Sequence, residues 1–194
     1  MQKLITEEEF ETWSQTFEGR AEFVDGEVII LSPESYNADN LRVFLQMLMR
    51  LFVEHHDLGI LGGPNVETRL RPGLRRVPDT YFLSNTRMQN LNPTFIARGP
   101  DLALEVVSPD SVERDRGRKL QDYQEAGVDE YWIIDPLCQE VLLYVRTQHG
   151  LTLAVAEGTI YRSTVLPGFF LDAAWLWRNP LPKVMSLLPE LGLL

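Results

Sequence analysis

The chain has 194 residues, a length typical of one domain with a buried core. Its net charge of -10 argues against a strong constitutive DNA clamp, because non-specific nucleic-acid binders usually carry a basic surplus. No apolar stretch is long enough to cross a membrane, residues 1–9 contain no apolar signal region, and the single Cys138 fits a reducing compartment, so we expect a cytoplasmic protein.

The first part of the chain carries clear helix and hairpin signals. Thr6 followed by three glutamates predicts a capping box and a short helix. The dipeptide Asp25-Gly26 separates two apolar runs, 21–24 and 27–31, and predicts a β-hairpin. Apolar residues then recur at helical spacing, which predicts one long amphipathic helix over 37–56.

The middle of the chain alternates between strands and turns. Residues 65–71 and 76–83 are predicted to be two strands joined across Pro72-Gly73. A short helix is expected over 85–91, and the residues that follow, 92–100, are rich in breakers and predict a loop.

The second half predicts a strand, a helix and a second strand. Residues 102–108 are apolar on both alternating faces, which is typical of a central strand covered on both sides. A helix over 111–126, closed by Gly127, and a buried strand over 131–136 complete a βαβ unit with parallel pairing. The closing elements are a hairpin and two short helical segments: 140–146 with 151–156, 170–177 and 184–188. No linker divides the chain, so we expect a single domain over 1–194.

Two acidic residues lie inside strand-like apolar runs. Glu105 interrupts the run 102–107, and Asp79 interrupts the run 77–83. A buried carboxylate costs several kcal/mol unless it is paired, hydrogen-bonded or bound to a metal. A shared metal ion is the simplest explanation for both acids.

A lysine is predicted to face the same interior. On a helical wheel of 111–126, Lys119 lies in the middle of the apolar face, among Val112, Tyr123 and Ala126. Asp79, Glu105 and Lys119 therefore form a candidate buried trio of two acids and one base. Such a set suits metal-assisted hydrolysis of a phosphodiester: Mg²⁺ takes oxygen ligands from carboxylates, and the lysine stabilises charge that develops in the transition state.

Two clusters of basic residues have a simpler interpretation. Residues 69–76 contain four arginines around the predicted hairpin, and residues 114–119 contain three arginines and Lys119 at the start of a helix. Apart from Lys119, we interpret both clusters as solvated faces rather than tracks for a phosphate backbone.

An ordered series of motifs extends beyond the trio. It comprises Pro78-Asp79, the segment 105–109, Lys119, Tyr123, Gly127-Val128 and the segment 130–135. The hairpin over 21–27 and Leu166-Pro167-Gly168 belong to the same series. In this series the chain resembles the Uma-type restriction endonuclease family of the PD-(D/E)XK nuclease superfamily, over about residues 20–172.

The resemblance implies a restriction endonuclease-like α/β (α+β) core, with a mixed sheet flanked by helices beside the N-terminal hairpin and long helix. It implies that Asp79 and Glu105 bind the metal, Mg²⁺ or alternatively Mn²⁺, that DNA is the substrate, and that the protein acts as a homodimer. Glu22 is a further candidate acid by resemblance only. One departure is Val107, which stands where the superfamily usually has its lysine; Lys119 is the natural substitute.

Three functions remain open at this point. The first is a Mg²⁺-dependent DNA endonuclease that uses Asp79, Glu105 and Lys119. The second is a non-catalytic binding or assembly module on the same fold, which the acidic net charge and Val107 favour. The third is a glycosidase that uses two carboxylates, for which sugar-facing aromatic residues would be needed.

Overall fold

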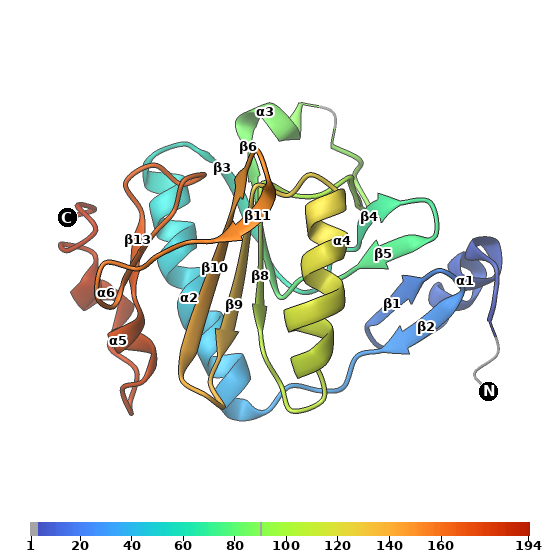
Figure 1. The fold of residues 1–194 in the computed structure, drawn as a ribbon, viewed down its shortest axis with the longest axis horizontal. Coiled ribbons are helices and arrows are strands. Elements are labelled where there is room, and N and C mark those ends of the chain that lie inside the picture. Colours follow the sequence, from blue (N-terminus) through green and yellow to red (C-terminus); the bar gives the residue numbers. More distant parts are fainter. Residues whose placement is uncertain (1–3, 90) are drawn as a thin grey trace.

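The computed structural model describes residues 4–89 and 91–194, and within these residues a six-stranded sheet forms the centre of the molecule (Figure 1). Its strand order is β11-β10-β9-β8-β6-β3. The strands are β3 (Gly59–Gly62), β6 (Thr80–Ser84), β8 (Leu102–Val106), β9 (Glu130–Asp135), β10 (Glu140–Thr147) and β11 (Gly150–Leu153). Strands β8 and β9 pair in parallel, as the βαβ pattern predicts, and the other neighbours in this sheet pair antiparallel.

A smaller sheet stands beside the main one and has the order β2-β1-β5-β4-β7 in the described part of the chain. Its strands are β1 (Ala21–Val24), β2 (Glu27–Ile30), β4 (Thr68–Arg71), β5 (Leu74–Arg76) and β7 (Ile96–Ala97). The predicted Asp25-Gly26 hairpin is confirmed as the β1–β2 pair, and both turn residues have positive φ. A separate two-stranded ribbon pairs β12 (Ile160–Arg162) with β13 (Phe170–Asp172).

Helices cover both faces of the main sheet, as Figure 1 shows. The long helix α2 lies on one face, and α4 lies on the other, between the main and the smaller sheet. The helices are α1 (Glu7–Ser14), α2 (Tyr36–His55), α3 (Asn85–Met88), the π-helix η1 (Arg114–Arg118), α4 (Lys119–Glu125), α5 (Ala173–Leu176) and α6 (Val184–Leu187). The predicted capping box at Thr6 is confirmed, and α2 agrees with its predicted bounds to one residue at each end.

Two hydrophobic clusters follow from the alternation of side chains along β8. Leu102, Leu104 and Val106 pack into the cluster that contains α2, whereas Ala103 and Val107 pack into the cluster that contains Tyr123 of α4. Successive strand residues point to opposite faces, so Glu105 points toward α4 together with Ala103 and Val107. This alternation decides on which side of the sheet the candidate site lies.

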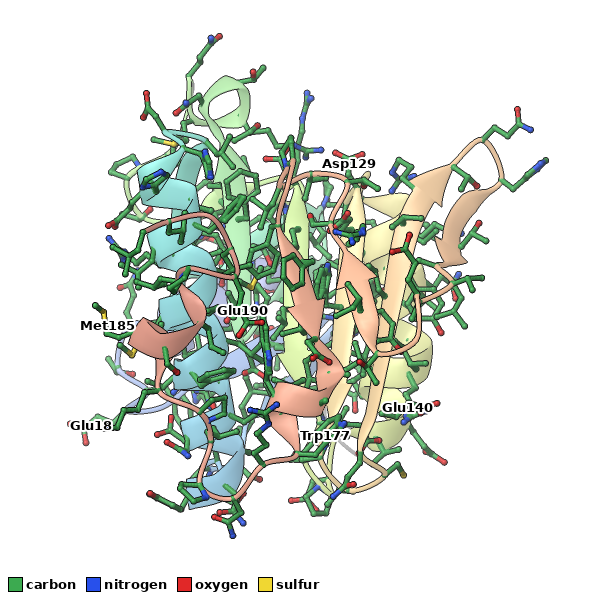
Figure 2. The ribbon with its side chains drawn as sticks, turned by 90° about the vertical axis from the view of Figure 1, so that its left-hand side faces the viewer. Glu18, Asp129, Glu140, Trp177, Met185 and Glu190 are labelled. Carbon is green, nitrogen blue, oxygen red and sulfur yellow. The ribbon has the colours of Figure 1, made fainter. Side chains whose placement is uncertain are left out.

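The C-terminal segment packs outside α2 and the strands on that face (Figure 2). Buried Glu130 of β9 anchors the start of this segment: its carboxylate accepts hydrogen bonds from Ser163 and Thr164. The prediction that 170–177 is wholly helical is wrong, because Phe170–Asp172 pairs with Ile160–Arg162 before α5 begins. Among the described residues, no helix combines the length and apolar character required to span a membrane.

One predicted strand is interrupted. The interpretation of 76–83 as a single strand is wrong, since Arg76 ends β5 in the smaller sheet and Thr80 begins β6 in the main sheet. Pro78 lies between them and has no backbone N–H to donate to a ladder. The sequence pattern also misses β3 and β7, which are short strands at the edges of the two sheets.

Candidate active site

Asp79 lies where the chain crosses from the smaller sheet to the main sheet. Its Oδ2 accepts a hydrogen bond of 2.9 Å from the backbone N–H of Val106, which fixes the carboxylate against the end of β8. Its Oδ1 lies 3.8 Å from Nη1 of Arg20. The side chain is 14% exposed, so this carboxylate is held in place yet still reaches solvent.

Glu105 lies on β8 and is almost completely buried on the face that α4 covers. Its Oε1 accepts a hydrogen bond of 3.0 Å from the hydroxyl of Tyr123 and lies 2.9 Å from Nζ of Lys119. Among the described residues, no side chain or backbone group donates a hydrogen bond to Oε2. One oxygen of Glu105 is therefore occupied by protein donors, and the other is free to bind a ligand.

Lys119 begins α4 directly after the π-helix η1, and its ammonium is buried among three carboxylates. Nζ lies 2.9 Å from Glu105, 3.2 Å from Asp115 and 3.5 Å from Glu22. A π-turn inserts an extra residue into a helix and rotates the side chains that precede it, and such turns often occur at functional sites. The inward placement of Lys119 agrees with the helical-wheel prediction.

Glu22 is a buried carboxylate that forms an ion pair with Lys119. It is fully buried on β1, its Oε2 accepts a hydrogen bond of 2.6 Å from Arg76, and its Oε1 accepts one of 3.2 Å from the N–H of Val77. Arg76 is also buried and donates to Asp122 of α4 at 2.9 Å. Glu22 does not line the pocket described below, and this position makes it a counter-ion of Lys119 and Arg76.

The pKa values of the carboxyl groups at and behind the pocket are shifted from their ordinary values. Burial raises the pKa of Asp79 to about 6, against the opposing effects of Lys119 and the N–H of Val106. Burial also raises the pKa of Glu105 well above its ordinary value; Lys119 opposes this rise, and Asp79 and Asp115 add to it. For Glu22, burial acts in the same direction, but Lys119 and Arg76 outweigh it and hold its pKa below the ordinary value.

Lys119 remains an ammonium ion. Burial alone would lower the pKa of Lys119, but Glu105, Glu22, Asp115 and Asp79 together raise it above its ordinary value. A permanently protonated amine cannot accept a proton from water at neutral pH. Lys119 can therefore stabilise or orient negative charge at the site, and it cannot act as a general base.

A pocket of about 100 Å³ opens in front of these groups. Its wall contains Asp79, Glu105 and Lys119. Among the described residues, five acids and three bases line it: Glu34, Asp79, Glu105, Asp110 and Asp115, with Arg20, Arg114 and Lys119. The acidic surplus favours a cation in this pocket.

The donor set fits a hard divalent cation that keeps part of its water shell. Within the described residues, no group of three or more His, Cys, Asp and Glu side chains is arranged to hold a metal ion by itself. Mg²⁺, however, is usually bound by one or two carboxylates together with water and a substrate phosphate. Oδ1 of Asp79 and Oε2 of Glu105 accept no hydrogen bond from a described residue, and they are the oxygens that a cation would use. The buried Oδ1 of Asp115 also lacks a hydrogen-bond partner, but it faces the Lys119 ammonium at 3.2 Å.

The structure brings Asp79, Glu105 and Lys119 to one pocket, but Asp79 lies in a bend between sheets and not in a strand. The expectation that both basic clusters are solvated is wrong for Arg75 and Arg76, which are buried in ion pairs with glutamates and Asp122. It is also wrong for Arg114, which lines the pocket. Sequence reasoning missed Arg114 because the π-turn changes the helical phase. It also missed Asp115, although Asp115 lies four residues before Lys119 and shares its face on a regular helix.

The comparisons with known proteins identify the family of the chain. The model of the Uma2 family, described as putative restriction endonuclease, matches residues 7–174, which is most of the chain. The chain belongs to the Uma2 family. The match includes Asp79, Glu105 and Lys119, and it confirms the resemblance drawn from the motif series. Among curated proteins, none matches the chain.

A solved structure has the same fold as this Uma2-family chain. It is the crystal structure of a putative nuclease of DUF820 from Anabaena variabilis, with a TM-score of 0.73 and 18% sequence identity. The alignment covers 89% of this chain and 97% of that chain. The predicted mixed α/β fold with a restriction endonuclease-like core is confirmed by this similarity.

Proposed function

We propose that the protein is a Mg²⁺-dependent endonuclease that hydrolyses phosphodiester bonds of DNA, with Asp79 and Glu105 as metal ligands. The observation that carries the proposal is the shared pocket, where both carboxylates meet the Lys119 ammonium, 2.9 Å from Glu105. The family description, putative restriction endonuclease, supports a nuclease and DNA as the substrate class. Mg²⁺ or Mn²⁺, when bound, would polarise the phosphoryl oxygen and lower the pKa of a bound water.

Each residue of the site has a separate task in this proposal. Asp79, fixed by the N–H of Val106, and Glu105, fixed by Tyr123 and Lys119, present one oxygen each to the cation. Lys119 orients the nucleophile and stabilises the negative charge that develops on the phosphoryl oxygens. Val107, which stands at the usual lysine position, is buried in the core and cannot supply this charge.

The test is cleavage of plasmid DNA in Mg²⁺ or Mn²⁺ by the wild type and by the Asp79→Asn and Glu105→Gln variants. Both substitutions keep the shape of the side chain and remove its charge. We expect each variant to lose at least about 100-fold in cleavage rate, the size of effect seen when a charge-stabilising group is removed. Cleavage at the wild-type rate by either variant would contradict the proposal.

Lys119 needs a more careful pair of substitutions. Removing one partner of a buried ion pair costs about 3–5 kcal/mol, so Lys119→Met is expected to unfold much of the protein. Lys119→Arg retains the positive charge but changes its shape. We expect the arginine variant to stay folded, with a circular dichroism spectrum like that of the wild type, and to cleave more slowly.

One observation favours a non-catalytic binding or assembly module. Lys119 is already neutralised by three buried carboxylates, so the trio would also be stable as a purely structural ion-pair network. Calorimetry separates the two functions: heat of binding for Mg²⁺ or Mn²⁺ that disappears in Asp79→Asn supports the nuclease. Its absence in the wild type supports the module.

Two further expectations follow from the same proposal. A glycosidase is disfavoured, because no aromatic side chain is among the described residues that line the pocket.

The homodimer stays a prediction based on resemblance: two copies would bring one pocket to each DNA strand. Light scattering of the purified protein would show whether its mass is twice the 22.3 kDa of the chain.

A further inference from the structure

Two arginine side chains at the pocket have hydrogen-bond donors that no protein group accepts. Nη1 of Arg20 and Nε of Arg114 are buried atoms without a hydrogen-bond partner among the described residues. Both residues line the pocket that contains Asp79 and Glu105. An unsatisfied buried N–H destabilises a folded protein, so such groups at a pocket point to a ligand that completes them.

Arg20 is held with one edge of its guanidinium toward the pocket. Its Nη2 donates to Glu34 at 2.9 Å, which fixes the side chain. Its Nη1 lies 3.8 Å from Oδ1 of Asp79, too far for a hydrogen bond. The side chain is 23% exposed and lines the pocket, but Nη1 itself is buried, so an anion in the pocket would contact this donor after a small shift of the neighbouring side chains.

Arg114 also lines the pocket. It is the first residue of η1, and its Nε lies 3.9 Å from Oδ1 of Asp115, again beyond hydrogen-bond distance. Lys119 approaches the same Oδ1 to 3.2 Å, but this oxygen is also a buried atom without a hydrogen-bond partner among the described residues. The Arg114 side chain is 25% exposed and makes no other ion pair among the described residues.

Arg42 and Arg76 differ from Arg20 and Arg114 in where they lie and in what accepts their hydrogen bonds. Arg76 donates to Glu22 and Asp122, and Arg42 donates to Glu34 and Gln46. Neither Arg42 nor Arg76 lines the pocket. Nε of Arg116 also lacks a partner, but Arg116 does not line the pocket, and its Nη2 already donates to Asp135 and Glu140. Arg20 and Arg114 are the arginines that combine a free donor with a position at the candidate active site.

We propose that Arg20 and Arg114 form a binding site for a phosphate group of the substrate, next to the cation site of Asp79 and Glu105. This inference rests on the proposed function and adds the residues that hold the anion. A guanidinium offers several N–H donors in a planar array that matches phosphate oxygens, and its charge does not depend on pH. Because acids outnumber bases in the pocket, the phosphate is expected to bind only together with a divalent cation.

The first test measures binding of a fluorescent 20-base-pair duplex in Ca²⁺, under conditions where gels show the duplex intact. Arg20→Gln and Arg114→Gln are compared with two controls: Arg118→Gln, an exposed arginine of the same π-helix, and Arg42→Gln, which breaks the other ion pair of Glu34. Each pocket variant should reduce the slope of log affinity against log salt by about 0.9, the value for one lost phosphate contact. The controls should keep the wild-type slope.

The second test does not depend on nuclease activity. Inorganic phosphate with Mg²⁺ should raise the melting temperature of the wild type and of both controls, but not of the doubly substituted Arg20→Gln, Arg114→Gln protein. Calorimetry with Mg²⁺ alone should give the doubly substituted protein an affinity at least as high as that of the wild type, because the substitutions remove positive charge beside Asp79. This result separates loss of the anion site from loss of the cation site.

The outcomes distinguish this inference from the proposed function. If the wild type cleaves DNA but the pocket variants keep the wild-type salt slope and phosphate response, the two arginines do not hold phosphate and the nuclease proposal stands. If the wild type does not cleave DNA but phosphate stabilises it through Arg20 and Arg114, the anion site stands and the substrate differs. If no protein responds to phosphate or binds DNA, the inference is overturned.

Discussion

At the scale of single residues, more acidic than basic side chains line the pocket, so its negative charge is only partly neutralised in the metal-free protein. Burial raises the pKa of Asp79 to about 6 and that of Glu105 well above its ordinary value, although Lys119 opposes both shifts. A divalent cation would stabilise the ionised carboxylates, and its binding would release protons. The stability of the metal-free protein should therefore report on these acids.

Asp79→Asn is expected to stabilise the metal-free protein at neutral pH. The pKa of Asp79 is about 6 in the folded state and 3.8 in the unfolded state, so the folded state binds more protons between these values. The stability of the wild type therefore falls as pH rises from about 4 to about 6, by up to about 3 kcal/mol. Asparagine does not ionise and can still accept the hydrogen bond from Val106.

Urea unfolding in EDTA checks this expectation. The difference in unfolding free energy between Asp79→Asn and the wild type should be larger at pH 8 than at pH 4. A difference that is the same at both pH values would show that the Asp79 carboxylate is not held in an unfavourable environment.

Helical periodicity alone predicted that Lys119 faces inward, because α4 begins at this residue and is a regular α-helix. The same wheel placed Arg114 outward, since it assumed one α-helix from 111 to 126. The π-turn over Arg114–Arg118 changes that phase, and its sequence contains no signal that distinguishes it from an α-helix. The acid-lysine trio was therefore predictable, and so was Asp115, which lies four residues before Lys119 on the same helical face, whereas Arg114 was not.

At the scale of elements, two irregularities build the site: the crossing at 77–79 and the π-helix η1. The crossing lets Asp79 approach the end of β8 while Glu22 and Arg76 remain in the smaller sheet. A continuous strand over 76–83 would have kept Asp79 in a ladder. Strand pairing depends on partners distant in sequence, and so the pattern of a single run could not reveal that it serves two sheets.

Two glycines, one within η1 and one after α4, should respond in opposite ways to alanine. A Cβ at Gly117 of η1 would meet no atom within 4 Å, so Gly117→Ala should stabilise the protein by about 0.5–1 kcal/mol through reduced freedom of the unfolded chain. Gly127 follows α4 with φ of +78°, a left-handed conformation, so Gly127→Ala should destabilise by about 1–2 kcal/mol.

Thermal or urea unfolding of the two variants provides the measurement, and each protein serves as the control for the other. Gly117→Ala should also retain wild-type cleavage, because its new methyl group lies in open space. Destabilisation by Gly117→Ala would mean that η1 has a different backbone in solution.

At the scale of the whole molecule, local patterns predicted the helices and the parallel β8–β9 unit, whose signals lie within short segments. They did not predict the division of strands between two sheets, nor the edge strands β3 and β7, which are short and stabilised by their neighbours. The net charge of -10 acts over the entire molecule and opposes the approach of DNA.

This charge predicts that DNA binding depends on divalent cations. In EDTA at about 150 mM salt, the wild type should show no binding to a duplex in fluorescence anisotropy, because its acids repel the phosphate backbone. Addition of Ca²⁺ should restore binding in the wild type but much less in Glu105→Gln. Strong binding in EDTA would locate the DNA contact away from the acidic pocket.

The most direct test of the central claim is anomalous diffraction from crystals of the protein soaked in Mn²⁺. We expect a Mn²⁺ peak between the Asp79 and Glu105 carboxylates in the wild type, and no peak at this position in Asp79→Asn crystals treated in the same way. A wild-type pocket that is open to solvent in the crystal and contains no Mn²⁺ peak would contradict the claim.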